Sequence, residues 1–181
     1  MNLKSINKTW TLFLDRDGVI NHEKIDDYIH TWDEFRFYDG VKEAIKIFTG
    51  KFGRIFIVTN QRGVAKGVTK LEDLKRIHKN MLREIEEAGG KIDKLYYCID
   101  ADPASPNRKP NTGMGLQAKA DFPEVTFSKS IMIGNTMSDM QFGRNLGVAF
   151  NILVRTRKEP AAEDKNIDIV FDDLISVARA L

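Results

Sequence analysis

Short apolar segments alternate with longer amphipathic segments along the chain, and this alternation constrains the fold more than any other feature. Apolar side chains recur at positions 71, 74, 77, 81, 82, 85 and 88, which is typical of an amphipathic helix that ends at Gly89 and Gly90. Residues 54–59 are instead rich in β-branched and aromatic side chains, which indicates a buried strand. This alternation predicts an α/β fold: a Rossmann-like parallel sheet with helices on both faces.

The same pattern divides the rest of the chain into elements. We expect further strands at residues 11–14, 95–99, 131–133, 148–154 and 167–171. We expect further helices at residues 41–48, 113–120, 139–145 and 172–181. Residues 21–38 are long enough only for a flap, and no large insertion separates the second strand from the third. We therefore predict one domain over residues 1–181, with no cap domain and an open site.

Charge balance and apolar content exclude several classes of protein. Lys and Arg number 28 and Asp and Glu 26, a net charge of +2, which argues against nucleic acid as a partner. The 42% hydrophobic content is typical of a globular domain and not of a disordered chain. Cys98 is the only cysteine, so it cannot form an internal disulfide. The apolar stretch at residues 10–14 is far too short for a signal sequence or a membrane span, so we predict a cytoplasmic protein with no membrane partner.

Polar side chains follow four of the expected strands, at the point where each strand ends. The clusters are Asp15-Arg16-Asp17-Gly18, Thr59-Asn60-Gln61, Arg108-Lys109-Pro110 and Gly134-Asn135-Thr-Met-Ser-Asp139. The carboxyl ends of parallel strands meet at one edge of a sheet and bind ligands there. Carboxylates, a hydroxyl, amides and a lysine at one edge indicate phosphoryl transfer with a divalent metal.

Asp15 and Asp17 are the most informative pair. Of two carboxylates at the end of a buried strand, one can attack phosphorus and form an aspartyl-phosphate. The other can protonate the leaving oxygen and later take a proton from water. Gly18 permits the tight turn that such a loop needs. The ordinary alternative is a strand end followed by turn-forming Asp and Gly.

The second and third clusters are interpreted as groups that bind the substrate. The Thr59 hydroxyl and the backbone N–H groups after it can hold phosphate oxygens, with Asn60 and Gln61 beside the substrate. Lys109 can balance the charge of nucleophile and phosphate, and Arg108 can bind the non-reacting part of the substrate. The alternatives are a plain strand end at Asn60 and two solvated surface charges.

Asn135 and Asp139 carry oxygen atoms of the kind that Mg²⁺ prefers. The alternative is helix capping, for which both residue types are favoured. The three histidines, His22, His30 and His78, show no ligand spacing and are interpreted as surface or hydrogen-bonded residues.

Taken together, the four clusters resemble the motifs of the haloacid dehalogenase superfamily of aspartate-nucleophile phosphatases. Four longer segments are similar to the D-glycero-D-manno-heptose 1,7-bisphosphate phosphatases, of which histidinol-phosphate phosphatases are close relatives. These segments are Thr59-Asn-Gln-Arg-Gly-Val-Ala-Lys-Gly67, Leu95-Tyr-Tyr-Cys98, Arg108-Lys-Pro-Asn-Thr-Gly-Met114 and Leu153-Val-Arg-Thr156. The resemblance spans nearly the whole chain.

The resemblance implies a role for each matching residue. Asp15 would be the nucleophile and a Mg²⁺ ligand, and Asp17 the general acid and base that gives Mg²⁺ its backbone carbonyl. Thr59 and Lys109 would stabilise the phosphoryl group, and Arg108 would help to recognise the substrate. Asn135 and Asp139 would complete the metal site.

The expected activity is Mg²⁺-dependent hydrolysis of a small-molecule phosphate ester, most simply a sugar phosphate. Three alternatives stay open: a histidinol-phosphate phosphatase, a polynucleotide 3′-phosphatase, and a phosphate-binding protein without activity. The near-neutral charge and the lack of a Walker A motif argue against the polynucleotide substrate. The sequence does not predict the oligomeric state.

Two positions depart from the family's pattern. Relatives often hold zinc with three Cys and one His in the loop before Arg-Lys-Pro, whereas this chain has only Cys98 there, so we predict no zinc. The usual aspartate at position 135 is asparagine. An amide oxygen can bind Mg²⁺ but brings no charge, so we expect Asn135→Asp to tighten Mg²⁺ binding.

Overall fold

Six parallel strands form the centre of the computed structural model, which describes residues 3–157 and 164–181. In spatial order the strands are β3 (Lys94–Cys98), β2 (Arg54–Asn60), β1 (Thr11–Leu14), β4 (Ser130–Gly134), β5 (Phe150–Val154) and β6 (Ile169–Phe171). Each neighbouring pair is parallel. The order reverses between β1 and β4, which is the kind of switch point where open α/β sheets bind ligands.

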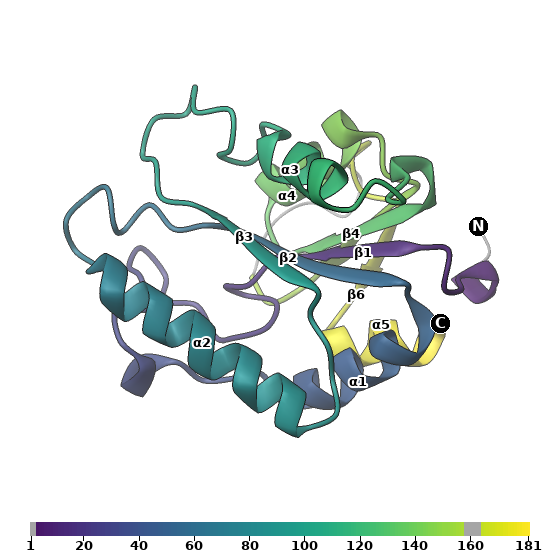
Figure 1. Ribbon diagram of the computed structural model, residues 1–181, viewed down its shortest axis with the longest axis horizontal. Helices are drawn as coiled ribbons and strands as arrows, with labels where there is room; N and C mark the ends of the chain where they lie inside the picture. The colour runs from purple at the N-terminus through teal and green to yellow at the C-terminus, as the bar shows by residue number, and fades with distance from the viewer. Residues whose placement is uncertain (1–2, 158–163) are drawn as a thin grey trace.

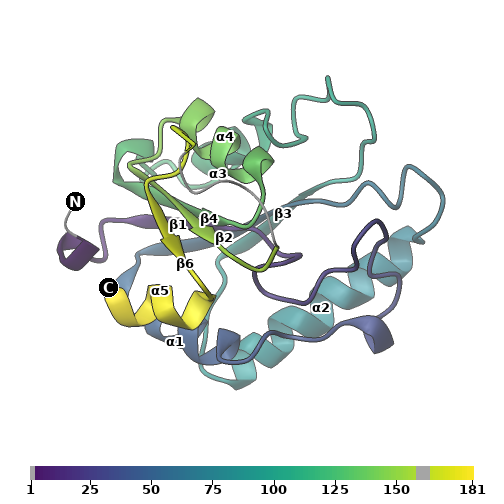
Figure 2. The same ribbon diagram turned by 180° about the vertical axis from the view of Figure 1, so that it is seen from behind.

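Helices cover both faces of the sheet, as Figures 1 and 2 show from opposite sides. One face carries α1 (Val41–Lys51), α2 (Leu71–Glu87) and α5 (Leu174–Ala180), and the other carries α3 (Gly113–Asp121) and α4 (Met137–Leu146). Short 3₁₀ turns span Leu3–Ser5, Trp32–Glu34 and Phe127–Lys129. The predicted Rossmann-like fold is therefore confirmed. Among the described residues, no helix is long and apolar enough to cross a membrane.

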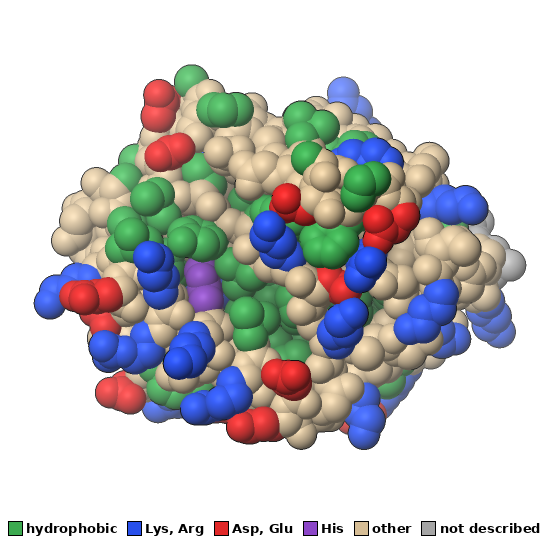
Figure 3. All heavy atoms as spheres, in the orientation of Figure 1, with side chains coloured by type: hydrophobic (Ala, Val, Ile, Leu, Met, Phe, Trp, Pro, Cys, Tyr) green, Lys and Arg blue, Asp and Glu red, His purple; other side chains and the backbone are tan. Residues whose placement is uncertain are grey.

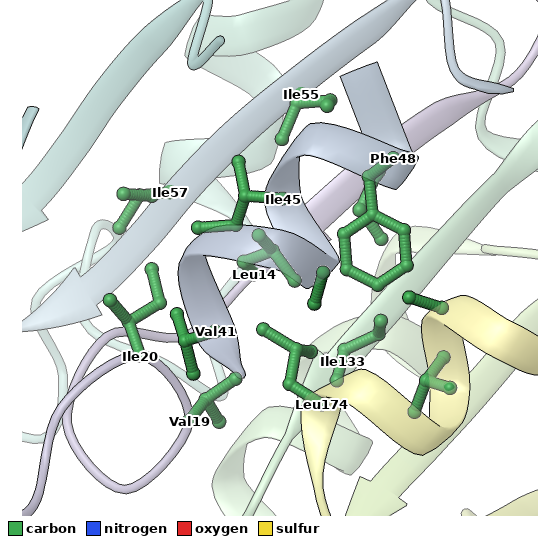
Figure 4. Close-up of a cluster of buried hydrophobic side chains, with 14 of the residues drawn as sticks. Leu14, Val19, Ile20, Val41, Ile45, Phe48, Ile55, Ile57, Ile133 and Leu174 are labelled. Atoms are coloured by element: carbon green, nitrogen blue, oxygen red, sulfur yellow. The ribbon is translucent and has the colours of Figure 1, made fainter. Parts of the chain in front are cut away.

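Both faces of the sheet are buried because the central strands are apolar at successive positions, and successive side chains point to opposite faces. Leu12 and Leu14 of β1 pack with α1 and α5, whereas Phe13 points to the opposite layer with Phe56 and Phe142. Figure 4 shows the first layer, in which Leu14 lies among side chains of β2, β4, α1 and α5. Each such burial contributes about 1.5–3 kcal/mol, so these layers fix the strand ends that carry the polar clusters.

Element ends differ from the predicted ones where local capping decides them. Helix α4 begins at Met137, two residues before the expected start, because Thr136 and Asp139 form a capping box there. Strand β5 begins at Phe150 and not at residue 148, because Gly147 ends α4 with a positive φ of 80°.

The predicted flap between β1 and α1 has no domain of its own. It contains one short helical turn, Trp32–Glu34, which lies against α2. The His30 ring Nδ1 lies 2.9 Å from the Thr69 hydroxyl, which connects the flap to the loop after β2. Among the described residues, no second folded unit lies between β1 and α1 or between β2 and β3, in agreement with the expected lack of a cap domain.

Candidate active site

The predicted clusters meet at the carboxyl ends of the strands, on the left in Figure 1 and far from both termini. Asp15 directly follows β1, and its N–H donates to the Ile133 carbonyl at 2.9 Å, which extends the β1–β4 pairing by one residue. Asp15 therefore keeps the position that the sheet gives it, with only 7% of its surface exposed.

Lys109 is the central cation of the site, although it lies 94 residues from Asp15 in the chain. Its Nζ lies 2.8 Å from Asp15 Oδ1, 2.6 Å from Asp139 Oδ1 and 2.7 Å from the Val58 carbonyl oxygen. Burial disfavours the charged ammonium, but the two carboxylates outweigh it and raise the pKa of Lys109. Lys109 is thus a fixed positive charge.

Asp15 and Asp139 place two negative charges around this one lysine. Burial, and next the nearby Asp139 carboxylate, raise the pKa of Asp15 to about 7 against the opposing effect of Lys109. Asp139 is 1% exposed, and its Oδ2 also accepts from the Thr136 N–H and hydroxyl, so it both caps α4 and holds Lys109. The surplus negative charge favours a second cation beside Asp15.

Asp17 lies in an opposite electrostatic environment, two residues from Asp15. The Arg16 guanidinium binds both of its carboxylate oxygens, at 2.7 and 2.8 Å. Asn21 Nδ2 donates at 2.9 Å and Gln61 Nε2 at 2.7 Å. Burial alone would raise the pKa of Asp17, but the Arg16 charge and these hydrogen bonds lower it.

The side-chain network that holds Asp17 is not predicted from the sequence. Arg16 is fully buried, and its Nη1 lies 2.9 Å from His78 Nε2 on α2. Because the guanidinium only donates, His78 Nε2 must accept, which fixes the neutral ring with its proton on Nδ1. The available signal was a histidine on the apolar face of the predicted helix, at a position next to Ile77.

Gly18 allows the turn after Asp17 to approach Asn135 closely. Its φ is +83°, and a Cβ there would lie only 1.9 Å from Asn135 Nδ2. Any side chain at this position would therefore displace Asn135 or the turn itself. The expected need for glycine at position 18 is confirmed.

The Asn135 amide is held so that one of its atoms stays without a partner. Its Nδ2 donates to Glu23 Oε1 at 2.9 Å and to Thr156 Oγ1 at 3.1 Å. Its Oδ1 is buried, and no described residue donates to it. A buried acceptor without a hydrogen bond costs free energy. A hard cation, or a water molecule bound to such a cation, would provide the missing partner of Asn135 Oδ1. The donor set of Asp15, Asn135 and the Asp17 carbonyl therefore fits Mg²⁺.

This candidate metal site is poor in charge. Among residues 3–157 and 164–181, no group of three or more His, Cys, Asp and Glu side chains is arranged to hold a metal. The two carboxylates, Asp15 and Asp139, share Lys109, and Asn135 offers only a neutral amide oxygen. The predicted roles of Asn135 and Asp139 as metal ligands stay predictions.

Asn60 and Gln61, predicted to bind substrate, use their side chains to hold other residues of the candidate site. Asn60 Oδ1 accepts from the Lys109 N–H at 3.0 Å, and its Nδ2 donates to the Lys109 carbonyl at 3.1 Å. Gln61 Nε2 donates to Asp17 Oδ2 and, at 2.9 Å, to the buried Thr59 hydroxyl. Their contact with substrate stays a prediction, as does that of Arg108, whose guanidinium donates to the Ala101 carbonyl.

Side-chain hydrogen bonds organise the loop between β3 and Lys109. Ser105 Oγ donates to Asp100 Oδ2 at 2.5 Å, and the Cys98 thiol lies 3.7 Å from each of these side-chain oxygens. Asn111 Nδ2 donates to the carbonyls of Pro103 and Ser105 at 3.0 and 2.8 Å. Side-chain hydrogen bonds thus stabilise the loop that places Lys109 next to Asp15.

Comparison with known proteins shows the family to which the chain belongs. A family model described as polynucleotide kinase 3 phosphatase matches residues 11–155. A solved D,D-heptose 1,7-bisphosphate phosphatase from B. bronchiseptica, complexed with magnesium and phosphate, superposes with a TM-score of 0.81 at 25% identity. That match covers 94% of this chain and 96% of the other. Fold and site together define a phosphatase of the haloacid dehalogenase class.

Two curated relatives narrow the family. The Campylobacter jejuni D-glycero-alpha-D-manno-heptose-1,7-bisphosphate 7-phosphatase is 41% identical over 84% of this chain and 86% of its own length. The Haemophilus influenzae D-glycero-beta-D-manno-heptose-1,7-bisphosphate 7-phosphatase is 32% identical over 94% and 95%. The chain belongs to this family of haloacid dehalogenase-like heptose bisphosphate phosphatases, as its sequence motifs had indicated.

Proposed function

We propose that the protein hydrolyses the phosphate at C7 of D-glycero-D-manno-heptose 1,7-bisphosphate through an aspartyl-phosphate on Asp15. The buried contact of Lys109 with both Asp15 and Asp139 carries the proposal, because it builds a phosphate-binding nucleophile site. The names of the two curated relatives supply the substrate class, and they differ in the anomer.

In the first step an Asp15 carboxylate oxygen attacks phosphorus, and the bond from phosphorus to the sugar oxygen breaks. The Lys109 ammonium offsets the charge of the carboxylate and the incoming phosphate together. The Thr59 hydroxyl is buried beside this centre and is proposed to donate to a phosphoryl oxygen. Asn60 fixes the Lys109 backbone so that its ammonium stays in place.

Asp17 moves the protons in both steps. It gives a proton to the leaving sugar oxygen, and its carboxylate then takes a proton from the water that attacks the acyl-phosphate. The products are the sugar alcohol group and inorganic phosphate, and free Asp15 returns. Arg16 holds Asp17 in place but lowers its pKa, so the negative charge of the bound phosphate must oppose Arg16 for Asp17 to gain its proton.

The residues that would hold Mg²⁺ are Asp15, through its carboxylate, Asp17, through its backbone carbonyl, and Asn135, through Oδ1. Asp139 supports them by holding Lys109. Bound Mg²⁺ supplies charge that neutralises the phosphoryl oxygens. Arg108 is proposed to bind the part of the substrate that does not react.

Two further proposals concern zinc and the location of the protein in the cell. We propose that the loop after β3 works without zinc, because the bonds among Cys98, Asp100 and Ser105 already hold it. Stoichiometric zinc in protein purified without added metal would contradict this. The cytoplasmic location predicted from the sequence likewise stays a proposal.

Substrate choice is tested with a panel at fixed Mg²⁺ concentration. The panel contains both anomers of the heptose bisphosphate, histidinol phosphate and 3′-phosphorylated DNA, with released phosphate as the readout. We expect the highest kcat/KM for one heptose anomer. We expect no turnover of the DNA, because the exposed Glu72, Glu86 and Glu87 of α2 lie among its basic side chains. Figure 3 shows acidic and basic side chains mixed over α2. Equal turnover of all four compounds would contradict the proposal.

A further inference from the structure

Glu23 reaches the candidate metal site from a distant part of the chain. It lies in the flap after β1, 112 residues before Asn135, and its side chain is only 11% exposed. Its Oε1 accepts from Asn135 Nδ2 at 2.9 Å and from Arg157 Nε at 2.6 Å. The Arg157 guanidinium also binds Oε2 and is half exposed. The catalytic steps proposed above give this carboxylate no role.

The hydrogen-bond chain around Asn135 fixes which way its amide points. The Thr156 hydroxyl donates to the Gly18 carbonyl, so toward Asn135 it can only accept. Glu23 offers only acceptor oxygens. Both hydrogens of the Asn135 amide are therefore used on this side, and the unpartnered Oδ1 points away from Glu23 and Thr156. A reversed amide would bring three oxygens together and is excluded.

We propose that Glu23 is a positioning residue for the divalent cation. It holds the Asn135 side chain so that Oδ1 is free to bind the cation. It also places a negative charge next to Asn135 Nδ2, which compensates for the charge that asparagine lacks. The inference rests on the proposed Mg²⁺-dependent function. Polarisation of the amide by a carboxylate on its N–H side makes Oδ1 a stronger ligand, as outer partners of metal ligands do.

This role reverses the expectation for Asn135→Asp drawn from the sequence. An aspartate at position 135 would place a carboxylate oxygen where Nδ2 now meets Glu23 Oε1, at about the same 2.9 Å separation. Repulsion between the two carboxylates would offset the added charge. We therefore expect Asn135→Asp to increase the affinity for Mg²⁺ only when the charge of Glu23 is removed in the same protein.

The test is calorimetric titration of Mg²⁺ into metal-free protein, with melting temperature measured in chelator as a check of the fold. Glu23→Gln keeps one acceptor oxygen for Asn135, removes the negative charge and replaces the oxygen that binds Arg157 Nη2 by an amide NH2, so we expect roughly ten-fold weaker Mg²⁺ binding. Arg157→Gln removes the opposing positive charge, so we expect tighter binding. A purely structural role for the pair would weaken binding in both variants.

The double variant completes the test. We expect Asn135→Asp alone to bind Mg²⁺ no tighter than the native protein, and Glu23→Gln with Asn135→Asp to recover the affinity lost in Glu23→Gln. Glu34→Gln removes a charge from the same flap, where Glu34 pairs with Lys24, and serves as the matched control with native affinity. Native affinity in Glu23→Gln, in a protein that binds Mg²⁺ and releases phosphate, would overturn this inference alone. No Mg²⁺ binding by the native protein would overturn the proposed function as well.

Discussion

Asp15 and Asp17 are separated by one residue, yet the structure gives them opposite environments. Asp15 faces a second carboxylate across one lysine, and burial with that carboxylate raises its pKa to about 7. Asp17 faces a buried guanidinium and two amide donors, which lower its pKa. Surplus negative charge suits a group that will meet a metal and a phosphate. A carboxylate held in place by cationic and amide donors suits a group that must face the leaving oxygen.

The largest expected effect comes from neutralising either carboxylate. Asp15→Asn should abolish turnover, a loss of roughly a thousand-fold or more, because an amide is a very poor nucleophile. Asp17→Asn should lower kcat by about 10²–10⁴-fold, because an amide cannot donate and regain a proton. Steady-state phosphate release measures both.

Stability should separate the same two variants. Asp15→Asn leaves Lys109 with Asp139 as a one-to-one pair, so we expect no loss of stability in metal-free buffer. Asp17→Asn leaves the buried Arg16 without its counter-charge and should cost about 1–3 kcal/mol, since Asp17 is partly solvated. Urea unfolding measures both. Equal losses would contradict the contrast between the two environments.

Removing Lys109 tests the charge surplus around Asp15. Lys109→Met leaves two buried carboxylates facing each other and should destabilise the metal-free protein by about 3 kcal/mol or more. Lys94→Met is the control, because its pair with Asp121 is exposed and should contribute little. Unfolding experiments in chelator compare them. A Lys109→Met protein as stable as the control would show that Asp15 and Asp139 do not repel.

His78 sharpens the comparison on the Asp17 side through pH. Burial, and next the Arg16 charge, lower the pKa of His78 from 6.5 to about 3. Between these values the unfolded chain binds more protons, so stability is full above about pH 6.5 and falls on acidification, by up to about 1.4 kcal/mol per pH unit. His78→Gln keeps an acceptor for Arg16 and should flatten this dependence.

Thermal unfolding at several values between pH 7 and pH 4 measures the slope for His78→Gln and for the native protein. His78→Leu is the matched variant that leaves the Arg16 donor unpaired. It should lose stability at every pH, whereas His78→Gln loses little at pH 7. Parallel pH profiles for native protein and His78→Gln would rule out the buried neutral ring.

The smallest effect is expected at Asn60. Asn60→Ala removes two hydrogen bonds to the Lys109 backbone and should cost about 1–2 kcal/mol, with a moderate fall in kcat as Lys109 loses its fixed position. Asn145→Ala is the control, because the exposed Asn145 side chain donates to the carbonyl of Pro110, the residue that follows Lys109. If both variants keep native kcat, Asn60 does not position Lys109.

The sequence by itself determined the layered fold and the set of residues that meet at the candidate site. Continuous apolar runs on β1, β2 and β4, each followed by a segment of helical periodicity, fixed the sheet, because such a pattern is a local property of each segment. Strand ends then placed Asp15, Thr59, Lys109 and Asp139 on one edge. Local capping shifted the ends of α4 and β5 by only two residues.

Only the tertiary structure decided what each of these residues touches. The sequence predicts that Asn60 and Gln61 bind the substrate, and only the structure shows that Asn60 also holds the Lys109 backbone 49 residues away and Gln61 holds Asp17 44 residues away. The Arg16 contact with His78 and the Glu23 contact with Asn135 also join distant segments. The strength of such a contact depends on distance and burial, which are set by how helices and loops pack on the sheet. No local pattern in the sequence encodes them.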